Sequence, residues 1–424
     1  MSAVAETKAP GSRKETTALT VLLFLAPLVT AAAPRLTWLF LLLMAGGLLF
    51  GFWRRGGDWR RLFQPNVAFL AVLAVALYAL LSAAWSADPG ASLGKAALLL
   101  AAVLVTLASS NAIAAWDRTE LRQAALAFAV GAFFGAIYVL IGIFTEDAVK
   151  RTAEIAVDVD GEAPAKFKLG ALRQNVTILV LYLWPALLAL TALTRPSRRR
   201  TFALLFFAAV AVPVLLSERE SAQVALIGSA LIFAMAWIWR PGTARVLAIA
   251  WCLAFALILP LTFAAYQAEL HKEHWLPKSA RARIILWEFT AERVLETPWV
   301  GIGADATREM HKSLTVEQPE DFVYPRTTGP HAHSLFLQVW YELGLFGAVL
   351  AALAGAATAL RITSLSAEAQ PFAAATFAAY GASVAFAWGV WQTWLLCGIA
   401  LTLLYLLIAS NAGTDRAAGA EQHD

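Results

Sequence analysis

The sequence predicts an all-α polytopic membrane protein with about twelve transmembrane helices. Hydrophobic residues make up 60% of the 424 residues and charged residues only 15%, which is far more apolar than an average soluble domain. The apolar residues are grouped in runs of about 20, the length that spans the hydrocarbon core of a bilayer as an α-helix. The net charge of +4 is spread over the short connections between these runs. That pattern is typical of membrane topology and not of a nucleic-acid-binding surface, so no nucleic-acid partner is expected.

The expected spans follow one another in chain order. The first has Lys8, Arg13 and Lys14 on its N-terminal side and a second apolar run directly after it, so we interpret it as a retained helix and not as a cleaved signal peptide. The twelve spans are 16–33, 36–53, 65–84, 95–115, 124–145, 174–194, 201–217, 222–239, 246–266, 333–360, 371–390 and 393–410. The expected organisation is nine helices in 1–266 with an outer loop at 146–173, a large outer loop at 267–332, three helices in 333–410 and a polar tail at 411–424.

The positive charges predict the orientation in the membrane. Lysine and arginine concentrate in alternate short connections, at 54–61, 195–200, 240–245 and Arg361. Because loops rich in these residues stay in the cytoplasm, we place both termini there. The two long loops then lie outside, which is the periplasm if the host is a Gram-negative bacterium and the protein lies in its inner membrane.

The outer loop 267–332 is longer than a simple connection between helices requires. Within it, 280-ARARIILWEFTAERVLE-296 has an amphipathic spacing and ends before Pro298, which predicts a helix in a partly helical loop. The sequence shows no internal repeat, so the inverted-repeat architecture of secondary transporters finds no support.

Two histidines, His331 and His333, stand at the start of the tenth span. In a regular helix residues two positions apart point to nearly opposite sides, so the pair cannot face one ligand from such a helix. We place His333 at or just before the first turn, where the helix dipole favours a neutral imidazole that can act as a general base. The alternative is a structural pair that fastens the loop to the helix. No third residue has the spacing of a zinc ligand, so no metal is expected.

Four arginines lie on the same side of the expected membrane: Arg173, Arg219, Arg281 and Arg283. The guanidinium group suits phosphate oxygens and stays charged when partly buried. A set that converges at the membrane surface would therefore bind a pyrophosphate, whereas each arginine alone could be an interface anchor. The acidic stretch 158-DVDGE-162 could hold a divalent ion, but an exposed acidic turn is the ordinary explanation.

Several motifs in the second half of the chain resemble the O-antigen ligase and polymerase superfamily. They are Arg283 four residues before Trp287, a Pro-x-x-Gly-x-Gly turn at Pro298, Gly301 and Gly303, a His–Ser pair at His333 and Ser334, a Glu-x-Gly-x-x-Gly segment at Glu342, Gly344 and Gly347, and 217-SERES-221, which is similar to the family's Ser-x-Arg motif. The resemblance is dense over 280–347 and rests on topology and length elsewhere.

The resemblance implies a GT-C-type membrane fold and a metal-independent, cofactor-free glycosyl transfer on the periplasmic face. The donor is a glycan on undecaprenyl pyrophosphate. Ligases transfer it to a sugar of the lipid A–core oligosaccharide, and polymerases to another lipid-linked repeat unit. A third branch glycosylates proteins, but its members usually carry an extra C-terminal domain, and this chain ends soon after its last expected helix. The ligases have a His-x-His motif at the place of 331-HAH-333, so we expect an O-antigen ligase that completes lipopolysaccharide.

Combined with the residues above, the resemblance predicts a mechanism. Arg173, Arg219 and Arg283 hold the pyrophosphate, with Arg281 beside them, and stabilise the charge that grows on it. His333 is the general base of an inverting displacement, and His331 either supports His333 from behind or contacts the acceptor.

Alternatives to this mechanism and function stay open. A retaining route would use an outer carboxylate as nucleophile, and Glu288, Glu292 and Asp305 are available by location. The first alternative function is an O-antigen polymerase that joins lipid-linked repeat units. The second is a transporter for the same lipid-linked glycan, but it would need ionisable residues inside the spans, and few are found there.

Overall fold

The computed structural model describes residues 13–160, 172–193, 196–217, 219–313 and 326–413. The helices in these ranges are α1 (Arg13–Ala32), α2 (Thr37–Arg54), α3 (Trp59–Leu62), α4 (Val67–Leu81), α5 (Pro89–Ala112), α6 (Arg118–Asp160), α7 (Leu172–Leu193), α8 (Pro196–Leu216), α9 (Glu220–Ile238), α10 (Arg240–Gln267), α11 (Lys278–Val294), α12 (Thr307–Ser313), α13 (Leu335–Arg361), α14 (Gln370–Phe386) and α15 (Thr393–Ala412). Short 3₁₀ turns join some of them, among them η1 (Pro34–Leu36) and η4 (Leu270–Lys272). Every regular element in the described ranges is helical, which confirms the all-α class.

Among the described residues, eleven helices are long and apolar enough to cross a membrane, which confirms a multi-pass membrane protein. Each corresponds to one of the expected spans. The exception is 371–390, where α14 stops at Phe386 after 17 residues. Such a helix is about 26 Å long, short of the roughly 30 Å of a hydrocarbon core. Residues 387–392 instead form an irregular loop, and this loop becomes part of the site described below.

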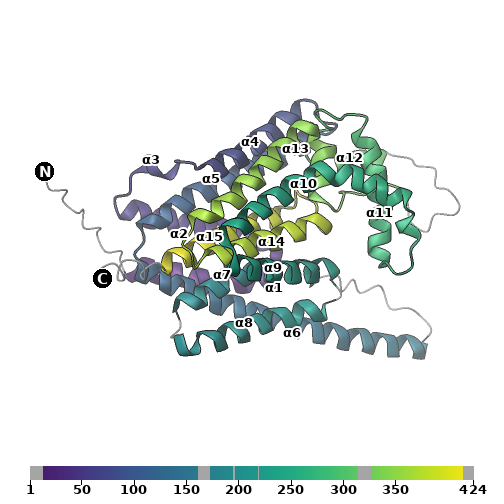
Figure 1. Cartoon of the computed structure of the whole chain (residues 1–424). Coiled ribbons are helices and arrows are strands. Elements are labelled where there is room, and N and C mark those ends of the chain that lie inside the picture. The colour runs from purple at the N-terminus through teal and green to yellow at the C-terminus, as the bar shows by residue number, and fades with distance from the viewer. Residues whose placement is uncertain (1–12, 161–171, 194–195, 218, 314–325, 414–424) are drawn as a thin grey trace.

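Helix α6 continues into the expected outer loop 146–173. Helix α6 runs on to Asp160 without a break, for 43 residues in all, and its end extends beyond the rest of the bundle (Figure 1). The chain has no glycine or proline between Gly142 and Gly161, so nothing in the sequence stops the helix once it leaves the apolar run. Asp158 and Asp160 of the acidic stretch lie on this helix and not in a turn, while residues 161–162 lie outside the described residues.

Helices α7 and α15 form the centre of the bundle. In their spans 83% and 72% of the residues are buried, against 22–50% in the other spans of the described chain. Close helix contacts depend on small residues, as is common in membranes. A side chain at Gly131 of α6 would overlap the carbonyl oxygen of Phe24 on α1, so these two helices meet backbone to backbone.

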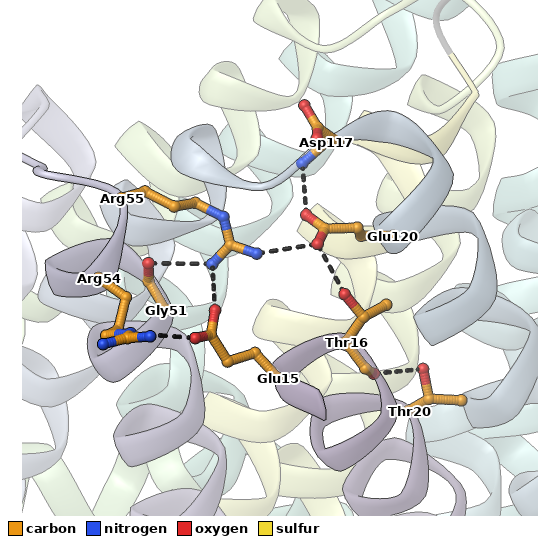
Figure 2. A network of polar contacts seen from close by, with 8 residues as sticks. All are labelled: Glu15, Thr16, Thr20, Gly51, Arg54, Arg55, Asp117 and Glu120. Atoms are coloured by element: carbon orange, nitrogen blue, oxygen red, sulfur yellow. Dashed lines mark hydrogen bonds and ion pairs between the residues drawn. The ribbon is translucent and has the colours of Figure 1, made fainter. Parts of the chain in front are cut away.

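A buried ionic cluster joins α1, α2 and α6 at one end of the bundle (Figure 2). Arg55, whose side chain is 4% exposed, lies 2.9 Å from a carboxylate oxygen of Glu120 and 3.7 Å from one of Glu15. Its guanidinium group also lies 4.0 Å from the ring centre of Trp116, and it donates to the carbonyl of Gly51 at 2.9 Å. Because each charge has several partners, the cluster fixes three helix ends together.

The long segment between α10 and α13 lies at the opposite end of the bundle (Figure 1). Its main element, α11, covers Lys278–Val294 and confirms the helix expected at 280–296. The buried face of α11 carries Ile284, Ile285, Phe289 and Val294, and the helix packs against α10 and α13. The amphipathic spacing therefore holds the segment on the bundle.

Candidate active site

Helix α13 is broken at Gly344, and a turn from the preceding segment fills the break. Gly344 has φ 62°, so the helix loses backbone hydrogen bonds on both sides of this residue. The turn 298–303 replaces them. The N–H of Gly303 donates to the carbonyl of Glu342 at 2.8 Å, and the N–H of Leu345 donates to the carbonyl of Pro298 at 2.8 Å. Two flanking bonds, Ile302 to Tyr341 at 3.2 Å and Phe346 to Trp299 at 3.3 Å, complete the set.

The glycines of the two motifs are required by this close approach. A side chain at Gly344 would overlap the backbone of Trp299, and one at Gly301 would overlap the backbone of Glu342. Gly301 and Gly303 also have positive φ angles of 67° and 100°, which residues with a Cβ rarely adopt. The Pro-x-x-Gly-x-Gly turn and the Glu-x-Gly segment are therefore two halves of one contact.

The carboxylate of Glu342 connects three segments of the chain. The residue is 1% exposed and accepts hydrogen bonds from the Thr307 hydroxyl at 2.6 Å, from the Gln338 amide at 3.1 Å and from the indole N–H of Trp391. These donors come from α12, α13 and the loop 387–392. A buried carboxylate with this many donors holds all three segments in one arrangement.

His333 lies in the irregular segment just before α13, which begins at Leu335. Its φ of 53° is uncommon for a residue other than glycine and marks a strained backbone at the site. Its Nδ1 lies 3.0 Å from the carbonyl oxygen of Ala387. A carbonyl only accepts, so Nδ1 carries the proton and, in the neutral ring, Nε2 keeps its lone pair.

The pKa of His333 is lowered, mainly by burial. The hydrogen bond to Ala387 works in the opposite direction, and the positive charges of Arg283 and Arg173 lower the pKa further. The ring is therefore neutral at pH 7, as expected, but burial and the two arginines are the cause and not only a helix dipole. The same interactions place Arg173 of α7 and Arg283 of α11 near one imidazole, from helices far apart in the sequence.

His331 lies against His333, with ring centres 4.1 Å apart. The segment 329–334 is not helical, so the limit that a regular helix sets for residues two positions apart does not apply here. Burial is the main cause that lowers the pKa of His331 to about 4, and His333 and Arg308 lower this pKa further. Its Nε2 is buried and has no hydrogen-bond partner among the described residues, which leaves it available to a bound group.

Arg219 and Arg281 lie at the same corner as Arg283. Arg219 stands at the start of α9, and the next residue, Glu220, accepts a hydrogen bond from Ser279 of α11 at 2.6 Å. Glu220 also faces Arg283 and raises its pKa, although burial has the larger, lowering effect. Arg281 is half-buried, and its Nε has no partner among the described residues.

Two of the three outer carboxylates share one cation. Arg326 lies 3.2 Å from Glu288 and 2.8 Å from Glu292, so both face a cation that the sequence did not single out. Burial raises the pKa of Asp305 against the lowering effect of Lys95 and Arg308. Lys95, Arg308 and Arg326 were missed because they stand alone in the sequence, without a motif beside them.

Comparison with known proteins agrees with the motifs. Residues 203–352 match the family model described as O-antigen ligase. No curated protein matched the chain. The matched region contains Arg219, α11, the turn 298–303, both histidines and the break in α13, so the resemblance that the motifs predicted is confirmed. Over residues 203–352, about a third of its length, this chain is therefore similar to the O-antigen ligase family.

Proposed function

We propose that the protein is an O-antigen ligase of the bacterial inner membrane, with its site on the periplasmic face. It transfers a glycan from undecaprenyl pyrophosphate to a sugar of the lipid A–core oligosaccharide. The observation that carries the proposal is the setting of His333, whose Nδ1 donates to Ala387. The neighbouring charges of Arg173 and Arg283 suit the pyrophosphate of such a donor.

In the proposed reaction, His333 is the general base. Its Nε2 takes the proton from the acceptor hydroxyl, whose oxygen then attacks the anomeric carbon. The bond between that carbon and the pyrophosphate oxygen breaks, and undecaprenyl pyrophosphate leaves with the bonding electrons. A single displacement of this kind inverts the anomeric configuration.

The arginines stabilise the leaving group. Arg173, Arg219 and Arg283, with Arg281 beside them, bind the pyrophosphate and offset the negative charge that develops on it. Their approach from α7, α9 and α11 supports a site formed by the folded chain and not by one loop. His331, whose Nε2 has no hydrogen-bond partner among the described residues, contacts the acceptor sugar.

An inverting route is favoured over a retaining one. The retaining route needs a free, ionised carboxylate nucleophile. Glu288 and Glu292 both face Arg326, and burial raises the pKa of Asp305 and so disfavours its ionised form. Determination of the product anomer by NMR tests this choice. Inversion is expected, and retention would mean that a carboxylate acts as nucleophile.

The function is tested in the host. The gene is deleted, and the lipopolysaccharide is compared on a gel with that of strains complemented by the wild-type or the His333→Ala protein. A ligase deletion removes the long-chain ladder and leaves polymerised glycan on undecaprenyl pyrophosphate. If one repeat unit is still joined to the core, the protein is a polymerase, and if no glycan reaches the periplasm at all, it is a transporter.

A further inference from the structure

A cavity of about 400 Å³ lies at the same end of the bundle as His333. It is bordered by the end of α1, η1, α6, the first turn of α7 and the loop 387–392. Its polar and aromatic lining consists of Arg35, Tyr138, Arg173, Gln174, Asn175 and Trp388. The volume is within the range of small-ligand sites, and nothing in the proposed reaction accounts for Arg35 or Asn175.

Two guanidinium groups reach this cavity from different parts of the chain. Arg35 belongs to η1 and Arg173 to α7. Neither has a carboxylate partner among the described residues, and both are exposed. Two unpaired cations at the wall of one cavity attract an anion and offer it several hydrogen-bond donors.

Asn175 adds an acceptor in need of a donor. It is 3% exposed, and its Nδ2 donates to the carbonyls of Ala31 at 2.6 Å and Ala32 at 2.9 Å. These bonds fix the amide, with Nδ2 towards the C-terminal end of α1. The Oδ1 of the same amide is buried without a partner among the described residues. A buried acceptor is normally paired, and a hydroxyl group of a ligand would supply the donor.

Trp388 supplies a fixed aromatic wall. Its indole N–H donates to Thr177 at 3.2 Å, and its ring meets Trp394 edge to face at 4.9 Å. Aromatic faces suit the apolar C–H side of a sugar ring. Trp388 follows Ala387, the acceptor of the His333 proton, so an occupant of the cavity lies next to the proposed base.

We propose that this cavity binds an anionic, hydroxyl-bearing sugar of one of the two glycan substrates, with Arg35 and Arg173 on its phosphate or carboxylate. Asn175 accepts from a hydroxyl of that sugar. The proposal rests on the proposed function for the identity of the substrates. The binding of an anion by Arg35 and Arg173 can be tested whether or not the protein transfers a glycan. Arg173, between this cavity and His333, is shared with the pyrophosphate site.

The first experiment uses a cysteine reporter in the purified, full-length protein in nanodiscs. Cys252 and Cys397 are replaced by serine, and Ala33→Cys introduces a thiol on the cavity wall. The probes are an anionic (sulfonatoethyl) and a cationic (trimethylammonioethyl) methanethiosulfonate, each rate being divided by that reagent's rate with a free thiol. The anionic reagent should react about tenfold faster than the cationic one, because two cations raise the local anion concentration.

Matched variants identify the source of this preference. Arg35→Gln should bring the normalised ratio towards one, whereas Arg60→Gln, at an exposed arginine of α3, should leave it unchanged. If Ala33→Cys does not fold, Leu172→Cys on the opposite wall serves as the reporter. Equal rates for both reagents in the reporter protein with Arg35 intact would overturn the proposal.

Protection and kinetics then distinguish the two sources of the sugar. The lipid-linked donor or the lipid A–core acceptor, whichever occupies the cavity, should slow labelling, and Arg35→Gln should raise its half-saturating concentration about tenfold with little change in kcat. If transfer is established but neither substrate protects the thiol, the cavity proposal fails alone. If transfer is absent while the anion preference stands, the proposed function fails and the anion site remains.

Discussion

The indole N–H of Trp391 donates to the buried carboxylate of Glu342, and this contact links the two halves of the site. Glu342 belongs to α13, the helix that follows the histidines, whereas Trp391 belongs to the loop whose Ala387 orients His333. The same loop is bound a second time, because the Val390 N–H donates to the side-chain oxygen of Gln338 at 3.2 Å. Glu342 is therefore a positioning residue for the proposed base.

Glu342→Gln should lower kcat about tenfold and destabilise the protein by about 1–3 kcal/mol, because the amide presents N–H groups where the carboxylate accepted hydrogen bonds. Turnover, the pH profile and Tm in detergent are the measurements. Glu296→Gln is the control, at a carboxylate whose side chain is 58% exposed. A variant with lower Tm but unchanged kcat and pH profile would show that Glu342 only stabilises the fold.

His333→Ala should abolish transfer without loss of the folded protein, and the pH profile of the wild type should reflect the lowered pKa of His333. Because the ring acts as a base only when neutral, kcat/KM should stay high below the ordinary histidine value of about 6.5 and fall only at lower pH.

Arg283→Gln removes a positive charge that lowers the pKa of His333. The pKa should rise, so the acid limb of the kcat/KM profile should move to higher pH, with a lower maximum because the pyrophosphate loses a partner. Arg293→Gln, on the same helix and paired with Glu296 at 2.6 Å, should leave the limb in place. An unmoved limb in Arg283→Gln would mean that another group titrates.

Gly344→Ala should destabilise the protein by at least about 1–3 kcal/mol, because the positive φ and the overlap with Trp299 both oppose a side chain. Gly46→Ala on α2 is the matched control, since a Cβ there meets nothing within 4 Å. Thermal unfolding in detergent compares them. Equal Tm values would mean that the turn 298–303 can withdraw from α13 at little cost.

Arg55→Gln should cost about 3–5 kcal/mol of stability, because it leaves two carboxylates without their buried cation. Arg54→Gln, whose side chain is 54% exposed, should cost about 0–1 kcal/mol. Both variants should keep wild-type kcat where folded, since the cluster lies at the far end of the bundle from His333. A loss of kcat in folded Arg55→Gln would reveal coupling between the two ends.

Most of the fold follows from the sequence because hydrophobicity alone identifies helices that cross a bilayer. The exceptions have local causes. Helix α6 continues past its apolar run because nothing there breaks a helix, and α14 ends early because its loop is held by Gln338 and Glu342. Contacts of that kind join residues about 50 positions apart, and no local pattern reveals them.

The site was predictable where a motif carried it and not elsewhere. Arg283 and His333 stand in dense motifs, and the structure brings them together. Three other features depend on how α1, α7 and the loop 387–392 meet, which no short stretch of sequence encodes. They are the position of Arg173 near His333, the hydrogen bond between His333 and Ala387, and the cavity lined by Arg35. Amphipathic spacing predicted α11 but could not predict which residue of another helix would face it.

The break at Gly344 has a consequence for chimeric proteins. The turn 298–303 and the backbone of 341–346 satisfy each other's hydrogen bonds through main-chain groups, so one half can be exchanged with a relative only if the incoming half keeps the glycines that allow the close approach. A swap of both halves together should preserve the position of His333 relative to α11, whatever the length of chain inserted between α12 and α13. This contact thus sets the position of Arg283 relative to His333. The segment between α12 and α13 can therefore vary in length and sequence.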